Sequence, residues 1–272
     1  MTVISTLITR VGTVHATDSL LTSLKSDGQR EPIEWQQTKI IPVRAWRGAM
    51  SYYGLALIEG RWSTLDWLRE QVTKADTFAT AERFAHALAD TLNREINALP
   101  LRREVDKGIG IHFSAYEWIN GYWIPEFFHI SNWSDPTYTA LRPSGVGASG
   151  DMSGALANQT PELVGNELAK RLAVHQAIQR GVWFQYNNGD PRLFNSAAKA
   201  IIDMFIELNS RGMLRDANNI EAIRALITQP VEMVSNIQHD FCADGTRVVG
   251  GKIHNLAINP NGEYSSTSGD TD

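Results

Sequence analysis

A threonine follows the first methionine of this chain, and an acidic residue stands sixteen positions further on, inside a run of β-forming residues: Thr2 and Asp18. A threonine hydroxyl is a poor nucleophile at neutral pH and needs a base to take its proton. After removal of Met1, which is expected before so small a residue, Thr2 would carry that base itself, because a free α-amine titrates at about 7.7 to 8.0. A threonine in second position is common in proteins of every kind, so the rest of the chain must decide whether this one is catalytic.

The composition describes a globular chain and argues against two classes of partner. At 272 residues, 43% of them hydrophobic, the chain can build one large domain or two small ones. A net charge of −5 and the lack of any polybasic run argue against binding to nucleic acid or to an anionic membrane surface.

Cysteine usage and hydropathy indicate the compartment. The single cysteine, Cys242, cannot form an intramolecular disulfide or a cysteine-based metal cage, which favours a reducing compartment. No stretch approaches the roughly 20 apolar residues of a spanning helix, and the first residues lack the layout of a signal peptide. We therefore expect a cytoplasmic protein.

The first residues predict strands. Val3–Thr9 and Thr13–Thr17 are rich in β-branched residues and are separated by Gly12, so they predict a hairpin. Lys39–Val43 and Ala49–Tyr53 repeat this pattern around a polar break.

Two amphipathic helices are predicted next. Ser63 and Asp66 form a capping-box pattern ahead of an apolar run, and an apolar stripe at helical spacing extends from Phe84 to Leu99. Trp62 and Trp67, assigned to the first of these helices, are candidate contact residues for a partner, with core packing as the alternative.

A long hairpin and more helices are predicted for the second half. Ile109–Trp118 and Tyr122–Ser131 flank Asn120-Gly121, a dipeptide that favours a two-residue hairpin turn. Helical stretches follow, with Gly181 and Gly212 as C-caps, and a closing strand comes last. The helical stretches cover Pro161–Arg180, Asn195–Arg211 and Asn219–His239, the last interrupted at Pro230, and the strand covers Val248–Ile258.

This order of elements predicts an α+β fold. Two antiparallel sheets stacked on each other and flanked by helices, a four-layer αββα sandwich, would let every sheet and helix bury an apolar face. The expected organisation is a single domain over residues 1–262 with an added helix around residues 190–216, followed by a flexible polar tail over residues 263–272.

Six segments carry a resemblance to a known family. They follow one another as TVISTLITRVGTVHATDSLLT, TKIIPV, MSYYGLA, HFSAYEWINGYWIPEFFHIS, VGASGD and VVGGKIHNLAINPNG. In type, order and the spacing from Thr2 to Asp18 they resemble the motifs of proteasome β-subunits, which are N-terminal nucleophile (Ntn) hydrolases. The chain is longer than a typical catalytic subunit, so it resembles a divergent bacterial homologue.

The resemblance implies roles for five residues. Thr2 would be nucleophile and, through its amine, general base. Lys39 would keep that amine unprotonated, with Asp18 compensating the lysine charge. The Gly54 N–H, at a strand end where the next helix begins, would donate to the oxyanion, and Ser149 would orient the amine and relay protons.

Further residues are implied less directly. Thr22, Tyr52 and Tyr53 would belong to the substrate pocket. Asp244 and Thr246 are tentative site residues, because the acid lies two positions earlier than in the family pattern and Val249 replaces the usual serine.

Each of these residues also has an ordinary structural alternative. The acid and the lysine could form a structural ion pair or lie exposed, the glycine could have no substrate role, and the tyrosines could be ordinary strand residues. His15 and His112 lie in strands without a partner at metal-ligand spacing, and His175 is expected to be packed on a helix.

The function implied is that of a proteasome-type threonine peptidase, which cuts peptide bonds through an acyl-enzyme at Thr2. Its partners would be a peptide or unfolded protein as substrate and further copies of itself in a ring-like homo-oligomer, with no cofactor, metal, nucleic acid or membrane, and an unfoldase partner is left open. Two alternatives use the same fold: a catalytically silent ring subunit, and a small-amide hydrolase or transpeptidase. GVGASG formally matches a dinucleotide-binding pattern, but no βαβ unit frames it.

Overall fold

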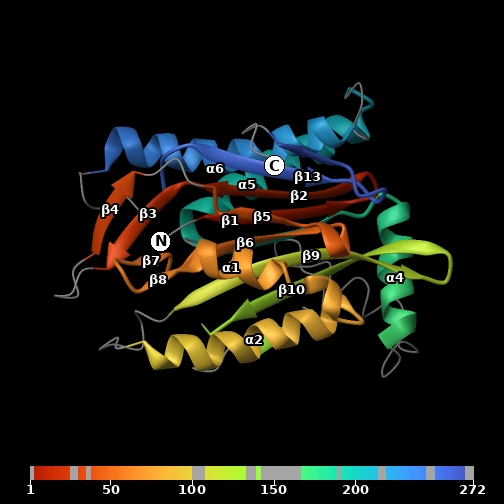
Figure 1. Cartoon of the computed structure of the whole chain (residues 1–272). Coiled ribbons are helices and arrows are strands. Elements are labelled where there is room, and N and C mark those ends of the chain that lie inside the picture. Colours follow the sequence, from red (N-terminus) through yellow and green to blue (C-terminus); the bar gives the residue numbers. More distant parts are fainter. Residues whose placement is uncertain are drawn as a thin grey trace.

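The computed structural model describes residues 3–24, 30–34, 38–99, 108–132, 139–141, 167–188, 191–213, 219–242 and 249–266. Within these ranges the chain forms two five-stranded antiparallel sheets, a smaller four-stranded sheet and five α-helices (Figure 1). The predicted α+β class with two antiparallel sheets is therefore confirmed.

The first sheet contains the N-terminal hairpin and the closing strand. Its strand order is β12-β1-β2-β13-β14, with β1 Ile4–Thr9, β2 Gly12–Asp18, β12 Phe184–Asn188, β13 Ile253–Ile258 and β14 Tyr264–Ser266. Every neighbouring pair is antiparallel, and the register sets Ile253 of β13 opposite Asp18, the last residue of β2. The predicted hairpin around Gly12 is confirmed.

The second sheet is built around the long central hairpin. Its strand order is β11-β10-β9-β6-β5, with β5 Ile40–Val43, β6 Gly48–Gly54, β9 Ile109–Ile119, β10 Tyr122–Ser131 and β11 Thr139–Leu141. Asn120 and Gly121 close the β9–β10 hairpin with φ of 51° and 88°, the backbone that a two-residue turn of this kind requires. This prediction is also confirmed.

A third, small sheet was not expected from the sequence. Its order is β4-β3-β7-β8, with β3 Leu20–Leu24, β4 Arg30–Glu34, β7 Leu57–Ile58 and β8 Trp62–Ser63. Strands β3 and β4, in the charged segment before Lys39, pair as an antiparallel hairpin. Short edge strands carrying charge and proline lack a clear alternation of apolar residues, and so give little signal.

The helices cover the outer faces of the two large sheets. Their bounds are α1 Thr64–Val72, α2 Ala81–Ala98, α4 Glu167–Gln179, α5 Pro191–Ser210 and α6 Ile220–Phe241. Figure 1 shows α5 and α6 beside the first sheet, α1 and α2 beside the second, and α4 across one end of the strands. Ser63 caps α1 by accepting a hydrogen bond from the Asp66 N–H, as the capping-box pattern predicted.

An ion-pair cluster fixes α4 to the long hairpin. Arg171 of α4 contacts the carboxylates of Glu117 on β9 and Glu126 on β10. Glu117 also accepts a hydrogen bond from the Ala81 N–H at the start of α2, with a distance of 2.6 Å. One carboxylate thus joins two helices to the second sheet.

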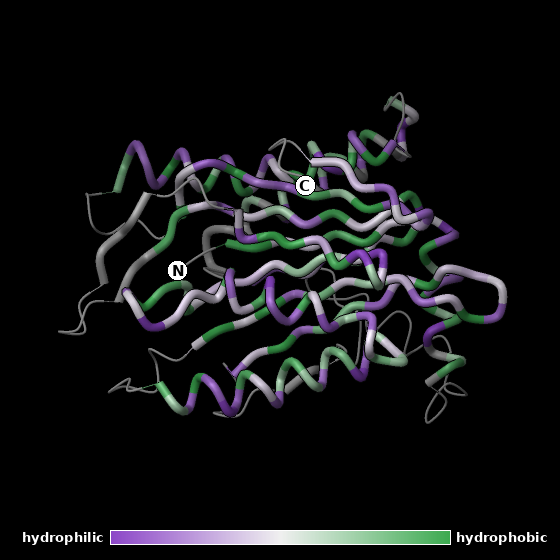
Figure 2. Tube along the Cα trace, in the orientation of Figure 1, coloured by the Kyte–Doolittle hydropathy of each residue, from purple (hydrophilic) through white to green (hydrophobic). Residues whose placement is uncertain are grey.

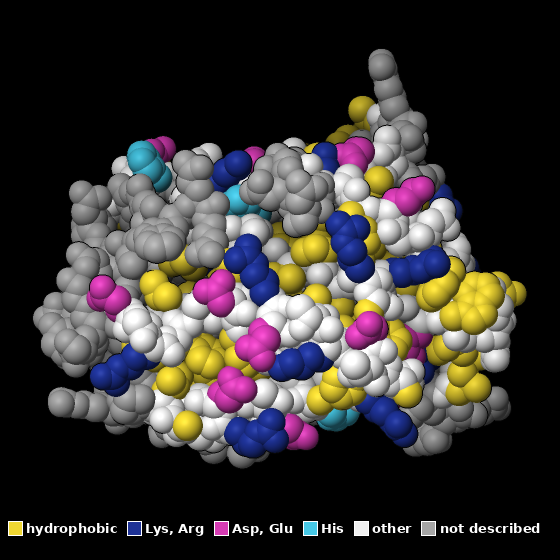
Figure 3. Space-filling model, in the orientation of Figure 1, with side chains coloured by type: hydrophobic (Ala, Val, Ile, Leu, Met, Phe, Trp, Pro, Cys, Tyr) yellow, Lys and Arg dark blue, Asp and Glu magenta, His cyan; other side chains and the backbone are white. Residues whose placement is uncertain are grey.

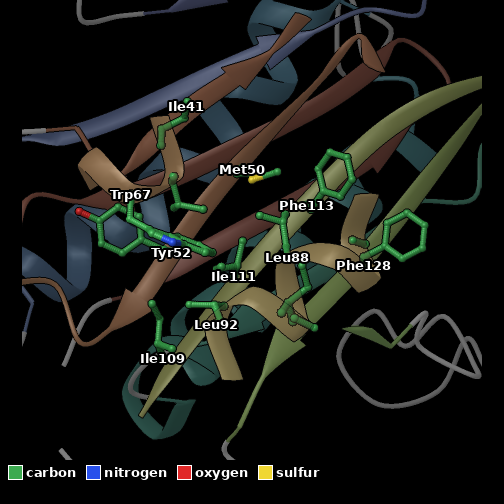
Figure 4. Packing of buried hydrophobic residues seen from close by; sticks show 14 of the residues in the cluster. Ile41, Met50, Tyr52, Trp67, Leu88, Leu92, Ile109, Ile111, Phe113 and Phe128 are labelled. Atoms are coloured by element: carbon green, nitrogen blue, oxygen red, sulfur yellow. The ribbon is translucent and has the colours of Figure 1, made fainter. Parts of the chain in front are cut away.

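The largest apolar cluster lies between the second sheet and helices α1 and α2. Alternate residues of the strands, among them Met50, Phe113 and Phe128, face Leu88 and Leu92 of α2 (Figure 4). Figure 2 shows the same division along the helices, where hydrophobic and hydrophilic residues alternate at the helical period. A second apolar cluster joins α6 to the outer face of the first sheet.

Three expectations need correction. Helix α6 runs through Pro230 without interruption. The tail expected to be flexible from residue 263 begins with β14, which pairs with β13, while residues 267–272 lie outside the described part of the chain. Trp67 is buried on α1 and packs at a tilt against Trp62, which belongs to β8 and not to the helix, so these tryptophans follow the core-packing alternative.

The surface carries charges of both signs. On the face shown in Figure 3, basic and acidic side chains are interspersed, and a group of hydrophobic side chains lies over the tip of the β9–β10 hairpin. Trp118 and Tyr122 of that tip are 59% and 57% exposed. Among the described helices, none combines the length and hydrophobicity that crossing a membrane requires.

Core packing on α2 gives a first prediction. Leu88 is 1% exposed, so Leu88→Ala should lower the free energy of unfolding by about 2 to 5 kcal/mol through lost burial and a residual cavity. Leu168→Ala on α4 is the matched control, because that side chain is 46% exposed and its loss should cost about 0.5 kcal/mol or less. Urea denaturation measures both, and equal losses would contradict the packing described for α2.

Candidate functional site

A buried ion pair joins the two large sheets at one end. Asp18 is the last residue of β2 in the first sheet, and Lys39 immediately precedes β5 in the second. Lys39 Nζ donates to Asp18 Oδ1 at 3.3 Å and to the Leu20 carbonyl oxygen at 2.7 Å. Both side chains are fully buried. Of the alternatives left open for these two residues, exposed charges are therefore excluded.

The Asp18 carboxylate also holds two backbone amides. Its Oδ1 accepts the Val3 N–H at 3.0 Å, and its Oδ2 accepts the Gly250 N–H at 3.2 Å. Val3 follows Thr2 in the sequence. The oxygen that contacts the lysine therefore also fixes the amide of the first described residue of the chain.

The glycine pair before β13 lies against this carboxylate. The Gly250 carbonyl oxygen accepts the N–H groups of Ser19 and Leu20 at 3.2 and 2.9 Å. Gly251 has a φ of 73°, in the left-handed region, and a Cβ there would lie 2.4 Å from the Ser19 Oγ, so a larger residue would strain the backbone and force that hydroxyl to move. The sequence motif that suggested the closing strand thus also shapes the site.

Burial is the largest influence on the pKa values of Asp18 and Lys39. Removal from water raises the pKa of Asp18 and lowers the pKa of Lys39, because each charged form loses its hydration. Attraction between the two groups opposes both shifts, and the N–H groups of Gly250 and Val3 further lower the pKa of Asp18. Each member of the pair therefore depends on the other to remain charged.

Two hydroxyls flank the acid in the sequence. Thr17 Oγ1 and Ser19 Oγ are buried and have no hydrogen-bond partner among the residues that the structure describes. Because buried hydroxyls normally find a partner, these two are available to groups beyond the described ranges or to a ligand. Sequence reasoning did not single them out.

Gly54 does not begin a helix in the structure, although the sequence had predicted one there. It is the last residue of β6, and the helix expected to begin there starts only at Thr64, after β7 and β8. Its φ of 93° lies in the left-handed region, and a Cβ would lie 2.3 Å from the Gly108 carbonyl oxygen. The backbone requires glycine here for these two reasons, whatever its role towards a substrate.

The two tyrosines predicted for the substrate pocket point to opposite faces of β6. Tyr52 faces the apolar cluster under α1, whereas Tyr53 points between the two sheets, where its hydroxyl is 2.9 Å from His129 Nε2. Consecutive strand residues point to opposite faces, so a single pocket cannot be lined by both. Thr22 lies in β3 opposite Pro32 of β4, and its side chain is outside the described part of the structure.

The remaining predicted site residues fall outside the described ranges. They are Thr2, Ser149, Asp244 and Thr246. Of the segment near the last two, the structure describes Val249, which is fully buried and donates its N–H to Gln238 of α6 at 2.9 Å. The roles of these four residues stay predictions.

A polar network between the sheets was missed by sequence reasoning. His15 of β2 is hydrogen-bonded through Nδ1 to Ser51 Oγ of β6 at 2.9 Å and through Nε2 to Ser114 Oγ of β9 at 2.7 Å. Thr6 Oγ1 of β1 lies 3.2 Å from His15 Nδ1 and 2.9 Å from His112 Nδ1. The contacts join four strands from both sheets.

The network continues to the edge of the first sheet. His112 Nε2 is hydrogen-bonded to Asn188 Oδ1 of β12 at 2.6 Å, and the His112 ring lies edge-on to His129. Burial lowers the pKa of His15 to about 3, of His129 to about 4, and of His112 well below its usual value. These imidazoles are therefore neutral at pH 7, which lets each donate and accept. In β2, Thr13, His15 and Thr17 alternate with apolar residues, and this alternation was the available signal.

Metal ligation has no assembled candidate among the described residues. Within those ranges no three or more His, Cys, Asp or Glu side chains gather in a way that would hold a metal ion. His175 on α4 stacks against Tyr122 with ring centroids 5.4 Å apart, as expected for a packed residue.

The buried pair predicts strong coupling in a double-mutant cycle. Lys39→Met should lower the free energy of unfolding by about 3 to 5 kcal/mol, because it leaves the Asp18 charge buried without its partner. Asp18→Asn should be similarly costly, while the double variant should lose much less than the sum of the two. Additive losses in urea denaturation would show that the two charges do not depend on each other.

The buried histidines predict acid sensitivity. Their pKa values are lower in the folded chain than the unfolded value of about 6.5, so the unfolded state binds more protons and stability falls as the pH drops below about 6.5 towards 4. Each histidine should approach a slope of roughly 1.4 kcal/mol per pH unit. The substitution His129→Gln removes one of these imidazoles. It should flatten the dependence of the free energy of unfolding on pH between pH 6.5 and 5, measured by urea denaturation. An unchanged slope would count against a neutral buried imidazole there.

Comparison with known proteins identifies only the fold. A scan against protein-family models gives no match, and neither does a search of curated proteins. Among solved structures, the chain resembles a mutant of Anbu from Hyphomicrobium sp. strain MC1, with a TM-score of 0.52 and 11% sequence identity over 99% of this chain and 89% of that chain. At this identity the likeness shows the fold alone: the chain shares the overall fold of that Anbu structure.

Proposed function

We propose that the protein is a proteasome-type threonine peptidase, in which Thr2, exposed by removal of Met1, attacks peptide bonds. The observation that carries this proposal is the sharing of Asp18 Oδ1 between Lys39 Nζ and the Val3 N–H. The residue bonded to that amide is Thr2. A nucleophile at this position would stand beside a buried cation whose own charge is balanced.

The chemistry follows from these groups. The Thr2 α-amine takes the hydroxyl proton as Oγ1 attacks the substrate carbonyl, and the same proton passes to the leaving amine as the C–N bond breaks. Water then attacks the ester in the reverse sense and releases the acid. The Lys39 ammonium favours the neutral form of the α-amine and stabilises negative charge that develops on the hydroxyl oxygen.

Other parts of the proposal rest on the family resemblance. The Gly54 N–H would donate to the oxyanion, Ser149 would relay protons to the amine, and Asp244 and Thr246 stay tentative. The arrangement of helices α5 and α6, the two sheets, and helices α1 and α2 supports an αββα layering of Ntn type. Assembly into a cytoplasmic homo-oligomer that admits peptides or unfolded proteins belongs to the same proposal.

Labelling by a mechanism-based probe tests the nucleophile. Intact mass should show the chain without Met1, and incubation with a peptide epoxyketone or β-lactone should add one probe mass, mapped to Thr2. Thr2→Ala should abolish the adduct, and acylation by Lys39→Met should be slower by about 100-fold or more. Thr73→Ala, at an exposed threonine of the described chain, is the matched control and should label like wild type.

The possible outcomes separate the proposal from its alternatives. Retention of Met1 throughout the population, or labelling that survives Thr2→Ala, would exclude the mechanism. A wild-type chain that loses Met1 but takes no label would favour the silent ring subunit. Labelling at Thr2 with turnover of small amides but not of peptides would favour the amidase or transpeptidase.

A further inference from the structure

We propose that His15 is a positioning residue, whose hydrogen bonds across the sandwich align β2 with β6 and thereby hold Asp18 in contact with Lys39. This inference deepens the proposed threonine-hydrolase function and rests on it. Sequence reasoning had left this histidine without a role.

The geometry around His15 fixes the ring in one orientation. Its two nitrogens lie 2.9 Å from Ser51 Oγ and 2.7 Å from Ser114 Oγ, and the residue is fully buried. Rotation of the ring would break both bonds, which is costly for a group that is buried away from bulk solvent. The imidazole therefore acts as a rigid spacer between the sheets.

His15 and Asp18 are placed on the same strand. They are three positions apart in β2, so a shift of that strand against the second sheet would move both. On the other side, Ser51 lies directly opposite Ile40, the residue after Lys39, and the Tyr52 N–H donates to the Lys39 carbonyl oxygen at 3.3 Å.

These contacts form a closed circuit. It runs from Asp18 along β2 to His15, across to Ser51, through the β5–β6 pairing to Lys39, and back to Asp18. Apolar contacts alone would tolerate small displacements of one sheet over the other, whereas hydrogen bonds are directional and lose strength steeply on misalignment. The hydrogen bonds of His15 therefore set the position of β2 relative to β6, and with it the distance between Asp18 and Lys39.

His112 offers a matched comparison within the same network. It is also a fully buried strand histidine with both nitrogens hydrogen-bonded, to Thr6 and Asn188. Its bonds join β9 to β1 and β12, and neither Asp18 nor Lys39 belongs to these strands. Loss of this ring removes similar interactions without opening the circuit.

Kinetics of acylation test the proposal. In His15→Gln, the maximal rate of acylation by the β-lactone probe should fall about tenfold or more while the concentration giving half-maximal rate stays within twofold, because alignment of the reacting groups is lost and substrate binding is not. In His112→Gln both constants should stay within twofold of wild type. Both variants are assayed at a temperature where circular dichroism shows them folded. Equal effects of the two substitutions would overturn the proposal.

A readout that needs no activity separates the two proposals. The coupling between Asp18→Asn and Lys39→Met, expressed as a ratio of unfolding equilibrium constants, should fall at least tenfold in the His15→Gln background and less than twofold in the His112→Gln background. An undiminished coupling in the His15→Gln background would overturn the positioning role. A wild-type chain that takes no label would instead overturn the threonine-hydrolase function, whatever the coupling.

A milder pair of variants covers the case in which His15→Gln does not fold. Ser51→Ala and Ser114→Ala each remove one hydroxyl partner of His15, and only Ser51 lies on the strand paired with Lys39. Ser51→Ala should slow acylation and reduce the Asp18–Lys39 coupling at least threefold more than Ser114→Ala. Equal effects would again overturn the proposal.

Discussion

The structure depends on one buried charge, the Asp18 carboxylate, which needs hydrogen-bond donors inside the protein. Asp18 is fully buried, and the cost of taking its carboxylate out of water is offset by three donors that the described residues place around it: one ammonium and two backbone amides. These donors come from three separate parts of the chain. The N-terminal strand, the start of β5 and the glycine pair before β13 are thereby fixed to one point. A buried ion pair adds little net stability compared with apolar packing, so its presence here is better explained by specificity of arrangement or by chemistry.

Neutral polar groups and a charged pair occupy different parts of the space between the sheets. The neutral groups His15, Ser51 and Ser114 are hydrogen-bonded to one another, while the charged pair lies at the end of the strands. The outer faces of both sheets, in contrast, bury ordinary apolar side chains under helices. Stability therefore comes mainly from the outer clusters, and alignment of one sheet with the other comes from hydrogen bonds inside.

Much of the fold could be predicted from local signals in the sequence. β-branched runs, the Asn120-Gly121 turn and the stripe beginning at Phe84 predicted two hairpins and a helix that the structure contains. The small sheet could not be predicted, because β7 and β8 are two residues long and acquire their structure only by pairing. The prediction that a helix begins at Gly54 was wrong for the same reason, because β7 and β8 lie between Gly54 and α1.

The candidate site was predictable in part. Types and spacing, read with the family resemblance, brought Asp18 and Lys39 together correctly, although they come from different sheets. The backbone amides of Val3 and Gly250 carry no sequence signal, since any residue supplies an N–H. The hydroxyls and imidazoles between the sheets were missed because each looks like an ordinary strand residue until the register aligns them.

The amide of Val3 has a practical consequence for anyone who produces this protein. It donates to a fully buried carboxylate, so Val3 is fixed at a buried point of the structure. Under the proposed mechanism, an affinity tag at the amino end would block the α-amine of Thr2. The tag is better placed at the carboxyl end, beyond β14, or in a cleavable leader that leaves no extra residue.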